Sequence, residues 1–209
     1  MSTHQISSSG DWGPVAVALA ESGWAALEDA IPAALCEVLR LELDMHVVRG
    51  ELRQAAIGHH DDRVIETAIR ADHILWFEGD TPAQRAWLDC MQDLRGYLNR
   101  TLYLGLQDYE CHFANYGPGS YYRKHYDCFR DDDARVVTTV LYLTSGWSEH
   151  DGGQLVLYDR ADDERVLCTI EPEAGTLAVF LSAVFPHEVL PTCRERASIT
   201  GWFRRRPLG

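Results

Sequence analysis

The feature that most limits the possible folds is a series of short β-type segments in the C-terminal half of the chain. After residue 108, stretches rich in β-branched and aromatic residues alternate at near-regular spacing with turn residues such as Gly, Pro and Asp. The segments read YECHFANY, YYRKHYD, RVVTTVLYL, QLVLYD, RVLCTI, TLAVFL, HEVL and RASITGWFRRR. Seven or eight short strands in this arrangement are typical of a β-sandwich or jelly roll.

The N-terminal half has a different pattern. Residues 13–22, 32–48 and 82–105 have the apolar spacing of helices, and strand-like segments occur at 23–31 and 68–79. The inward face expected for the second helix carries Leu35, Val38, Leu39, Met45 and His46, interrupted by Glu42. Helices followed by strands predict an α+β fold, in which N-terminal helices pack on one sheet of a double-stranded β-helix.

The length of 209 residues is most simply that of one domain. We expect a loose leader over residues 1–10, helical support with an entrance loop over 11–107, and the double-stranded β-helix core over 108–205. The entrance loop is placed at 49–64, which is polar and contains two glycines.

Charge and apolar content exclude some classes of protein. Asp and Glu outnumber Lys and Arg by 32 to 19, for a net charge of −13, which disfavours nucleic acid as a partner. No apolar run reaches membrane-spanning length, and the first twenty residues lack the Lys or Arg of a secretory signal. The six cysteines include no C-x-x-C pair, which favours reduced thiols and a cytoplasmic location.

The segment SYYRKHYDCFR contains a candidate metal site. His125 and Asp127 are two residues apart, so in a strand their side chains would project to the same face. An imidazole and a carboxylate are two parts of the 2-His-1-carboxylate set that suits Fe(II), and His187 in FPHEVLP is the candidate for the third ligand.

Other histidines compete for this role. The segment HHDD at 59–62 contains two further His-x-Asp pairs, but its polar setting indicates a solvated loop. His112, on a predicted strand, is a candidate to line the cavity, although no carboxylate lies two residues away.

Arg196 is a candidate anion-binding residue. It opens a strand in which Arg196, Ser198 and Thr200 would share one face. A cation on an inward face needs an anionic partner, and a dicarboxylate co-substrate would supply one. Tyr142 is placed to donate its hydroxyl to the same carboxylate, and a surface charge beside Glu195 is the alternative for Arg196.

These motifs together resemble a known family. HYD, FPHEV and RASITGWF, with IRADHILWFEG and ANYGPGSYYRKHYD, are similar to segments of the Fe(II)/2-oxoglutarate-dependent oxygenases of the prolyl 4-hydroxylase branch. That branch includes the hypoxia-inducible-factor prolyl hydroxylases and their bacterial homologues. The similarity covers roughly residues 50–204.

The resemblance implies a single oxygenase domain and a role for each matching residue. It implies Fe(II) as the metal, 2-oxoglutarate and O2 as co-substrates, ascorbate as a reductant, and succinate and CO2 as products. The implied iron ligands, which form the catalytic centre, are His125, Asp127 and His187. The implied 2-oxoglutarate-binding residues are Arg196, Tyr142, Thr200 and Tyr116. The implied substrate-binding residues are Tyr122, Arg135, Trp202, Asp72 and Arg70.

The substrate stays open at this point. The resemblance implies hydroxylation of a prolyl residue in a protein, with elongation factor Tu as a candidate, and by analogy a role in oxygen sensing. The alternatives are the same chemistry on free proline or a peptide, and a non-catalytic metal-binding jelly roll. Ala71 replaces a glycine of the family pattern, and the loops GHHDDRVIETA at 58–68 and CFRDDDA at 128–134 differ from it.

Overall fold

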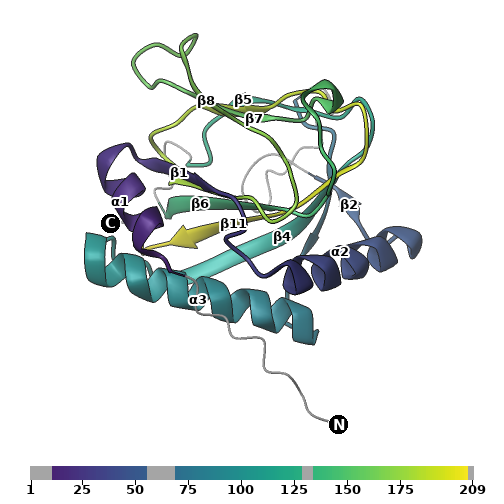
Figure 1. Cartoon of the computed structure of the whole chain (residues 1–209), viewed down its shortest axis with the longest axis horizontal. Coiled ribbons are helices and arrows are strands. Elements are labelled where there is room, and N and C mark those ends of the chain that lie inside the picture. The colour runs from purple at the N-terminus through teal and green to yellow at the C-terminus, as the bar shows by residue number, and fades with distance from the viewer. Residues whose placement is uncertain (1–10, 56–68, 129–133, 207–209) are drawn as a thin grey trace.

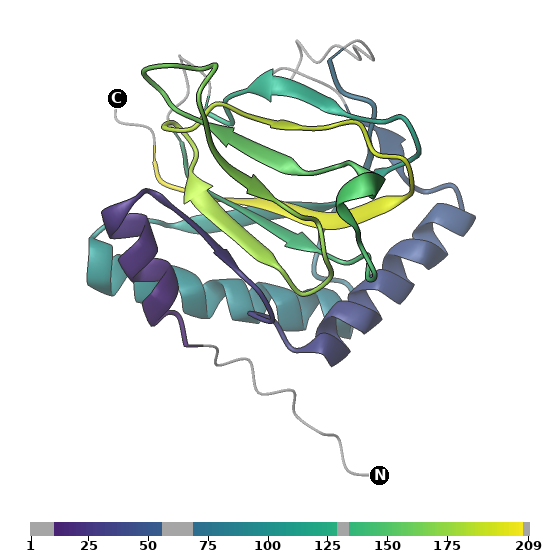
Figure 2. The same cartoon turned by 45° about the horizontal axis from the view of Figure 1, so that its top comes forward.

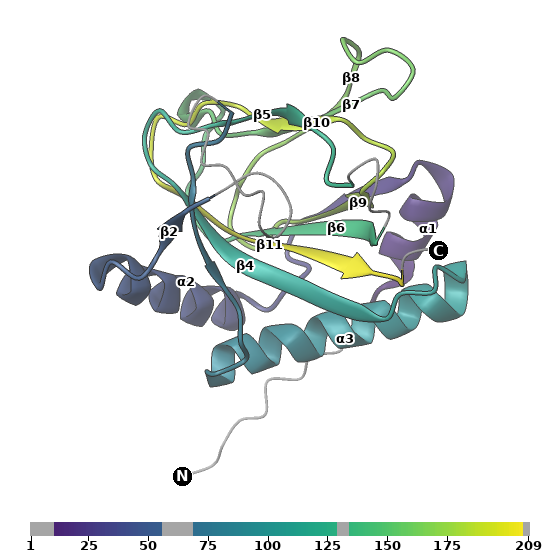
Figure 3. The same ribbon diagram turned by 180° about the vertical axis from the view of Figure 1, so that it is seen from behind.

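Two antiparallel sheets make up most of the computed structural model, which describes residues 11–55, 69–128 and 134–206 (Figure 1). The larger sheet has seven strands in the order β1-β9-β6-β11-β4-β3-β2, and the smaller has four in the order β5-β10-β7-β8. Figure 3 shows the smaller sheet facing the larger, with the long strands β4 and β11 running along helix α3. This architecture confirms the predicted double-stranded β-helix with helices on one sheet.

All eight C-terminal segments predicted as strands form strands. Their bounds are β4 Asp108–Tyr116, β5 Tyr122–His125, β6 Arg135–Tyr142, β7 Leu155–Tyr158, β8 Val166–Ile170, β9 Leu177–Leu181, β10 His187–Val189 and β11 Arg196–Arg204. A 3-10 helix, η2, spans Glu149–Asp151 between β6 and β7.

Three further strands come from the N-terminal half and join the larger sheet. They are β1 Trp24–Leu27, β2 Arg53–Gln54 and β3 His73–Trp76. Strands at the positions of β1 and β3 were expected, but β2 lies inside the stretch predicted as an exposed loop. It pairs with β3, which in turn pairs with β4, so this part of the chain becomes one edge of the larger sheet.

The helices cover the outer face of the larger sheet (Figure 2). They are α1 Gly13–Glu21, α2 Ala33–Val48 and α3 Pro82–Leu102. Helix α3 starts where the Thr81 hydroxyl accepts a hydrogen bond from the Gln84 backbone N–H at 3.1 Å. It ends at Leu102 rather than at the predicted residue 105, because Tyr103 adopts a left-handed conformation with φ of 55°.

Two hydrophobic cores lie on opposite faces of the larger sheet. In β9, Leu177 and Val179 pack towards the helices, whereas Ala178 and Phe180 pack between the sheets. Strand β11 divides in the same way, with Ala197 and the residues in phase with it facing the helices. The opposite face of β11, which carries Arg196, Thr200 and Trp202, therefore points into the space between the sheets.

The predicted inner face of α2 was partly wrong. Val38 and Met45 are 47% and 52% exposed, whereas Glu42 is buried at 5%. The Glu42 carboxylate accepts hydrogen bonds from Thr81 Oγ1 and Gln84 Nε2, both at 2.7 Å. These partners on the neighbouring helix allow a carboxylate to occupy a buried position.

Some of the predicted segments fall outside the described residues, namely the leader at 1–10 and most of the entrance loop, including the two His-x-Asp pairs at 59–62. Within the described ranges, none of the helices is both long enough and apolar enough to cross a membrane.

Candidate active site

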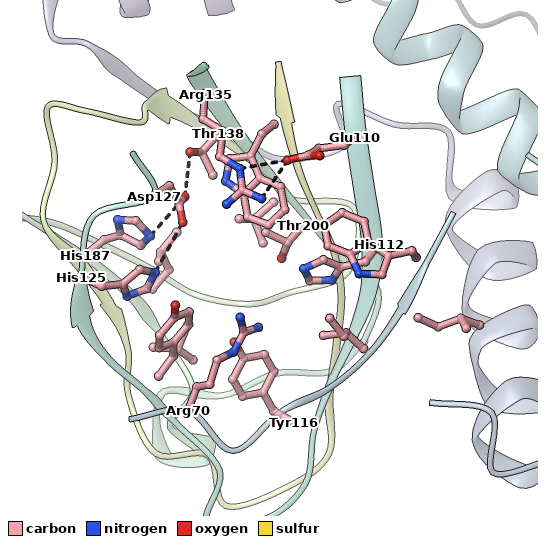
Figure 4. A pocket seen from close by; sticks show the side chains of 18 of the residues that line it. Arg70, Glu110, His112, Tyr116, His125, Asp127, Arg135, Thr138, His187 and Thr200 are labelled. Carbon is pink, nitrogen blue, oxygen red and sulfur yellow. Dashed lines mark hydrogen bonds and ion pairs between the residues drawn. The ribbon is translucent and has the colours of Figure 1, made fainter. Parts of the chain in front are cut away.

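A cavity of about 840 Å³ opens between the two sheets. Its wall includes all the predicted site residues except Asp72 and Tyr142, which lie behind it. The close-up view shows His125, Asp127 and His187 gathered on one side and His112 and Thr200 on another (Figure 4).

The three predicted metal ligands form one cluster. Asp127 Oδ1 lies 3.5 Å from His125 Nε2, and Asp127 Oδ2 lies 3.4 Å from His187 Nε2. One candidate ligand atom from each residue lies within 4.8 Å of the others. The cluster forms because β5 and β10 are antiparallel neighbours in which His125 and His187 are paired directly.

The sequence analysis expected His125 and Asp127 to project from the same face of one strand, and that expectation was wrong. Strand β5 ends at His125, and Asp127 lies in the bend that follows, not on the same face of a continuous strand. The strand is also irregular, since Tyr122 and His125, three residues apart, pair with Val189 and His187, two apart. This bulge lets the Tyr122 ring stack on the His125 ring, with centroids 3.6 Å apart and planes at 16°.

Backbone carbonyls orient both imidazoles. His125 Nδ1 donates to the Arg123 carbonyl oxygen at 2.7 Å, and His187 Nδ1 donates to the Phe185 carbonyl oxygen at 3.1 Å. Each Nδ1 therefore carries a proton, and each Nε2 is the ring nitrogen that faces Asp127. This is the ligand form of histidine, and a hydrogen bond to the other ring nitrogen is the usual support for it.

The charges in the cluster also suit a divalent cation. Burial would raise the pKa of Asp127, but the neighbouring His187, His125 and Arg135 outweigh it and hold that pKa well below its usual range. Burial lowers the pKa of His187 to about 4, so this ring is neutral at pH 7. One carboxylate and two imidazoles match the set that binds Fe(II) and leaves positions open for other ligands.

A hydroxyl chain supports the carboxylate from behind. Thr138 Oγ1 donates to Asp127 Oδ2 at 2.8 Å and lies 2.8 Å from Ser182 Oγ. Thr138 and Ser182 are 1% and 0% exposed, so bulk water does not compete for the hydrogen bonds of these hydroxyls. The sequence analysis missed both residues, although Thr138 lies in phase with Val140 and Tyr142 on β6 and so could have been placed on the inner face.

Arg196 is a buried cation that lacks a carboxylate partner among the described residues. It is 1% exposed, and its Cζ lies 4.9 Å from the ring centroids of both Tyr116 and Tyr142. Arg196 Nη1 donates a long hydrogen bond of 3.5 Å to Ser198 Oγ, while Arg196 Nε and the Tyr142 hydroxyl have no hydrogen-bond partner in the described ranges. Burial raises the pKa of Tyr142 to about 12 against the opposing charge of Arg196, so its hydroxyl remains a donor. A buried guanidinium beside a free hydroxyl fits a carboxylate ligand, such as that of 2-oxoglutarate.

Arg70 and Asp72 form an ion pair beside the metal cluster. Arg70 Nε and Nη2 donate to the two Asp72 carboxylate oxygens at 2.8 and 2.6 Å, and Asp72 is fully buried. The Arg70 guanidinium lies 4.5 Å from the Tyr122 ring centroid, on the ring that stacks on His125. The ion pair therefore helps to fix the Tyr122 ring beside His125, a candidate metal ligand.

Arg135 and Trp202 form a second part of the wall. The Arg135 Cζ lies 3.6 Å from the Trp202 ring centroid, and Arg135 Nε and Nη2 donate to Glu110 Oε1 at 3.0 and 2.8 Å. The other Glu110 oxygen accepts from Arg204 Nη1 at 2.8 Å. The sequence analysis missed Glu110, which lies in phase with His112 on β4.

Comparison with known proteins agrees with this site. Residues 111–204 match the model of the family described as the 2OG-Fe(II) oxygenase superfamily. A hypoxia-inducible factor prolyl hydroxylase of Caenorhabditis elegans is 27% identical over 197 residues; the match covers 88% of this chain but spans only 27% of the length of that protein.

Two solved structures are similar over most of both chains. The crystal structure of a Pseudomonas putida prolyl-4-hydroxylase is 47% identical with a TM-score of 0.82, covering 92% of this chain and 97% of that one. A prolyl hydroxylase of Trichoplax adhaerens, in complex with a peptide fragment of the hypoxia-inducible factor oxygen degradation domain, is 29% identical with a TM-score of 0.78, covering 91% and 87%. Together with the His-Asp-His cluster, these similarities show that the chain belongs to the 2OG-Fe(II) oxygenase superfamily, as an oxidoreductase that uses Fe(II), 2-oxoglutarate and O2.

Proposed function

We propose that the protein hydroxylates a prolyl residue of a protein substrate and converts 2-oxoglutarate and O2 into succinate and CO2. The observation that carries the proposal is the joint placement of two groups in one cavity. The His-Asp-His cluster lies on one wall, and the buried Arg196 lacks a carboxylate partner in the described part of the chain. A dicarboxylate held by Arg196 would supply the missing counter-charge.

Different residues of the cavity would hold the metal, the co-substrate and the reacting carbon. His125, Asp127 and His187 would hold Fe(II), and Arg196 with Tyr142 would hold the far carboxylate of 2-oxoglutarate, beside Thr200 and Tyr116. When bound, Fe(II) and 2-oxoglutarate supply the chemistry that splits O2, with one oxygen atom entering succinate and the other entering the C–H bond. Thr138 would keep the Asp127 carboxylate oriented, and the aromatic wall would limit water at the reacting carbon.

A prolyl substrate is supported by the relatives and by the composition of the wall. The similar structures from Pseudomonas putida and Trichoplax adhaerens are prolyl hydroxylases, and the second holds a peptide. Here Trp76, Tyr122 and Trp202 line the cavity together with Arg70 and Arg135. Aromatic faces suit a proline ring, and the charged groups suit the peptide on either side of it.

Elongation factor Tu is our candidate substrate, and free proline or a short peptide is the alternative. We place the reaction in the cytoplasm, the compartment that the cysteine pattern of the sequence favours. The family assignment replaces the earlier alternative of a non-catalytic metal-binding protein.

The test begins with protein reconstituted anaerobically with Fe(II) and then given 2-oxoglutarate and O2. Succinate is measured alone and with purified elongation factor Tu, with free proline, or with the protein fraction of a cell lysate. The Asp127→Ala and Arg196→Ala variants serve as inactive forms, and Arg165→Ala, whose side chain is 66% exposed, serves as the matched control.

Stimulation by a protein, with one added oxygen atom on a proline by mass spectrometry, supports the proposal. Hydroxylation of elongation factor Tu identifies the substrate. Stimulation by free proline alone contradicts the protein substrate and leaves the oxygenase chemistry intact.

A further inference from the structure

His112 is a buried polar residue that the reaction described above does not use. It is 2% exposed, lies on β4 and lines the cavity. Figure 4 shows its imidazole pointing into the cavity near Thr200, away from the metal cluster. Two indole rings flank it, that of Trp76 with centroids 4.9 Å apart and that of Trp202 at 5.5 Å.

The protonation of this ring follows from its surroundings. His112 Nδ1 donates to the Phe113 carbonyl oxygen at 3.0 Å, because a carbonyl can only accept. Burial, helped by the charges of Arg70 and Arg135 and opposed by Asp72, lowers the pKa of His112 to about 4. The ring is therefore neutral at pH 7, with its proton on Nδ1 and a lone pair on Nε2.

The Nε2 acceptor is not satisfied by the protein itself. Within residues 11–55, 69–128 and 134–206 it has no hydrogen-bond partner. His112 lines the cavity, so a ligand that brings an N–H or O–H group into the cavity can satisfy this acceptor.

A proline ring within a peptide offers no such donor. Its nitrogen is a tertiary amide, and the carbon atoms to be hydroxylated are apolar before the reaction. The nearest donors on a prolyl substrate are the backbone N–H groups of the residues beside the proline. An acceptor between two indoles can therefore accept a hydrogen bond from the peptide backbone next to the proline ring, while the indole faces contact apolar parts of the same segment.

We propose that His112 Nε2 accepts a hydrogen bond from the backbone N–H of a residue flanking the target proline, and so selects prolyl peptides that carry that N–H. This inference rests on the proposed function, since it concerns the substrate of the same site. It makes His112 a specificity-determining residue, with a polypeptide rather than free proline as its ligand.

The test compares wild type with His112→Leu, which removes the acceptor, and His112→Gln, which keeps one. The probe is a set of short synthetic peptides with one central proline and randomised flanking residues. Peptides with a second proline at a flanking position lack the backbone N–H at that position, because proline has none. Succinate formed without peptide reports the oxygenase centre, and mass spectrometry of the peptides reports hydroxylation. Thermal melting checks that each variant is folded.

Peptide-independent succinate formation is measured in all three proteins, and the hydroxylation of each peptide is expressed relative to it. Wild type and His112→Gln should reject proline at one flanking position, whereas His112→Leu should hydroxylate the favoured peptides on the order of tenfold less efficiently and accept proline at that position. An unchanged efficiency and an unchanged discrimination in His112→Leu overturn the inference.

A second measurement needs only wild type, in case the buried substitution disturbs folding. One favoured peptide is made with each flanking N–H replaced in turn by N–CH3. One replacement should reduce hydroxylation strongly and the other should not, and equal tolerance of both overturns the inference. If wild type forms succinate but hydroxylates no peptide, the prolyl hydroxylase proposal itself fails, and this result is distinct from a failure at His112 alone.

Discussion

The guanidinium of Arg196 lies 4.9 Å from the ring centroid of Tyr142, at a buried position where Arg196 Nε and the Tyr142 hydroxyl both lack a hydrogen-bond partner among the described residues. Such an arrangement costs stability unless a ligand completes it. We therefore interpret it as a preformed carboxylate-binding site, whose unsatisfied groups are matched by 2-oxoglutarate.

Removing this buried charge should affect ligand-free and ligand-bound protein in opposite directions. The Arg196→Leu variant should melt at the same temperature as wild type or higher without ligand, because it no longer buries an unpaired cation. It should lose the rise in melting temperature that 2-oxoglutarate with Mn(II) or Zn(II) gives to wild type, with binding weakened on the order of a hundredfold. Differential scanning calorimetry with Arg165→Ala as control measures both effects, and retained stabilisation by 2-oxoglutarate would contradict the assignment of Arg196.

Thr138 should control how tightly the metal is held. The Thr138→Val variant keeps the shape of the side chain but removes the hydroxyl that donates to Asp127 Oδ2 at 2.8 Å. We expect Fe(II) affinity to fall by roughly tenfold to a hundredfold, because the carboxylate loses its fixed orientation.

The control for that experiment is the adjacent residue. Thr139→Val removes a hydroxyl that lies 2.8 Å from the Tyr109 hydroxyl, away from the metal cluster. Metal titration in the absence of O2 should show a loss in Thr138→Val alone, and an equal loss in both variants would point to general destabilisation.

The buried Glu42 should contribute to stability through its two donors on the N-terminal turn of α3. In Glu42→Ala, Thr81 Oγ1 and Gln84 Nε2 lose the acceptors that each now reaches at 2.7 Å. We expect the free energy of unfolding to fall by roughly 2–4 kcal/mol, the cost of leaving the buried Gln84 donor and the half-buried Thr81 donor unpaired together with the lost packing. Urea unfolding of Glu42→Ala against the exposed Glu37→Ala measures this, and losses of similar size would show that burial of Glu42 is not the cause.

The lowered pKa of His112 gives a defined pH dependence of stability. In the unfolded chain this histidine would titrate near 6.5, whereas in the folded protein its pKa is about 4. Below pH 6.5 the unfolded state therefore binds more protons, so the contribution of neutral His112 is fully present above that pH and is lost as the pH falls towards 4.

The His112→Leu variant isolates this contribution. Between pH 6 and 4.5 the free energy of unfolding of metal-free wild type should fall more steeply than that of the variant, by up to about 1.4 kcal/mol per pH unit. Other groups that titrate in this range, including His187, remain in both proteins. Parallel pH profiles for the two proteins would mean that the folded state does not hold His112 neutral.

Much of the core could be predicted because its pattern is local. The alternation in RASITGWFRRR places Arg196 and Thr200 on one face and Ala197 on the other, and β11 has this arrangement. A strand imposes a period of two on its side chains whatever its neighbours are, so the face can be read from the sequence alone. The histidines and the aspartate of the metal cluster were recognised from their residue types and the family resemblance, whereas the period-of-two argument for His125 and Asp127 failed because Asp127 lies beyond the end of β5.

The same local reasoning was wrong where tertiary contacts decide the outcome. Helical spacing made Val38 and Met45 candidates for the core of α2, yet both are exposed while Glu42 is buried. Helical spacing shows which residues share a face, but not which neighbouring element covers that face. Which residues of α2 are buried therefore depends on the hydrogen-bond donors that Thr81 and Gln84 supply to Glu42.

The site shows the same division between sequence and tertiary structure. The sequence by itself determined the strand pattern, the metal-binding residue types and the presence of a cation on an inward face. Only the tertiary structure decided that a bend after β5 brings Asp127 to the histidines, that Thr138 supports it, and that Glu110 binds Arg135 above Trp202. The physical reason is that residue type and period depend on neighbours along the chain, whereas these contacts join segments far apart in sequence whose pairing only the packed sheets define.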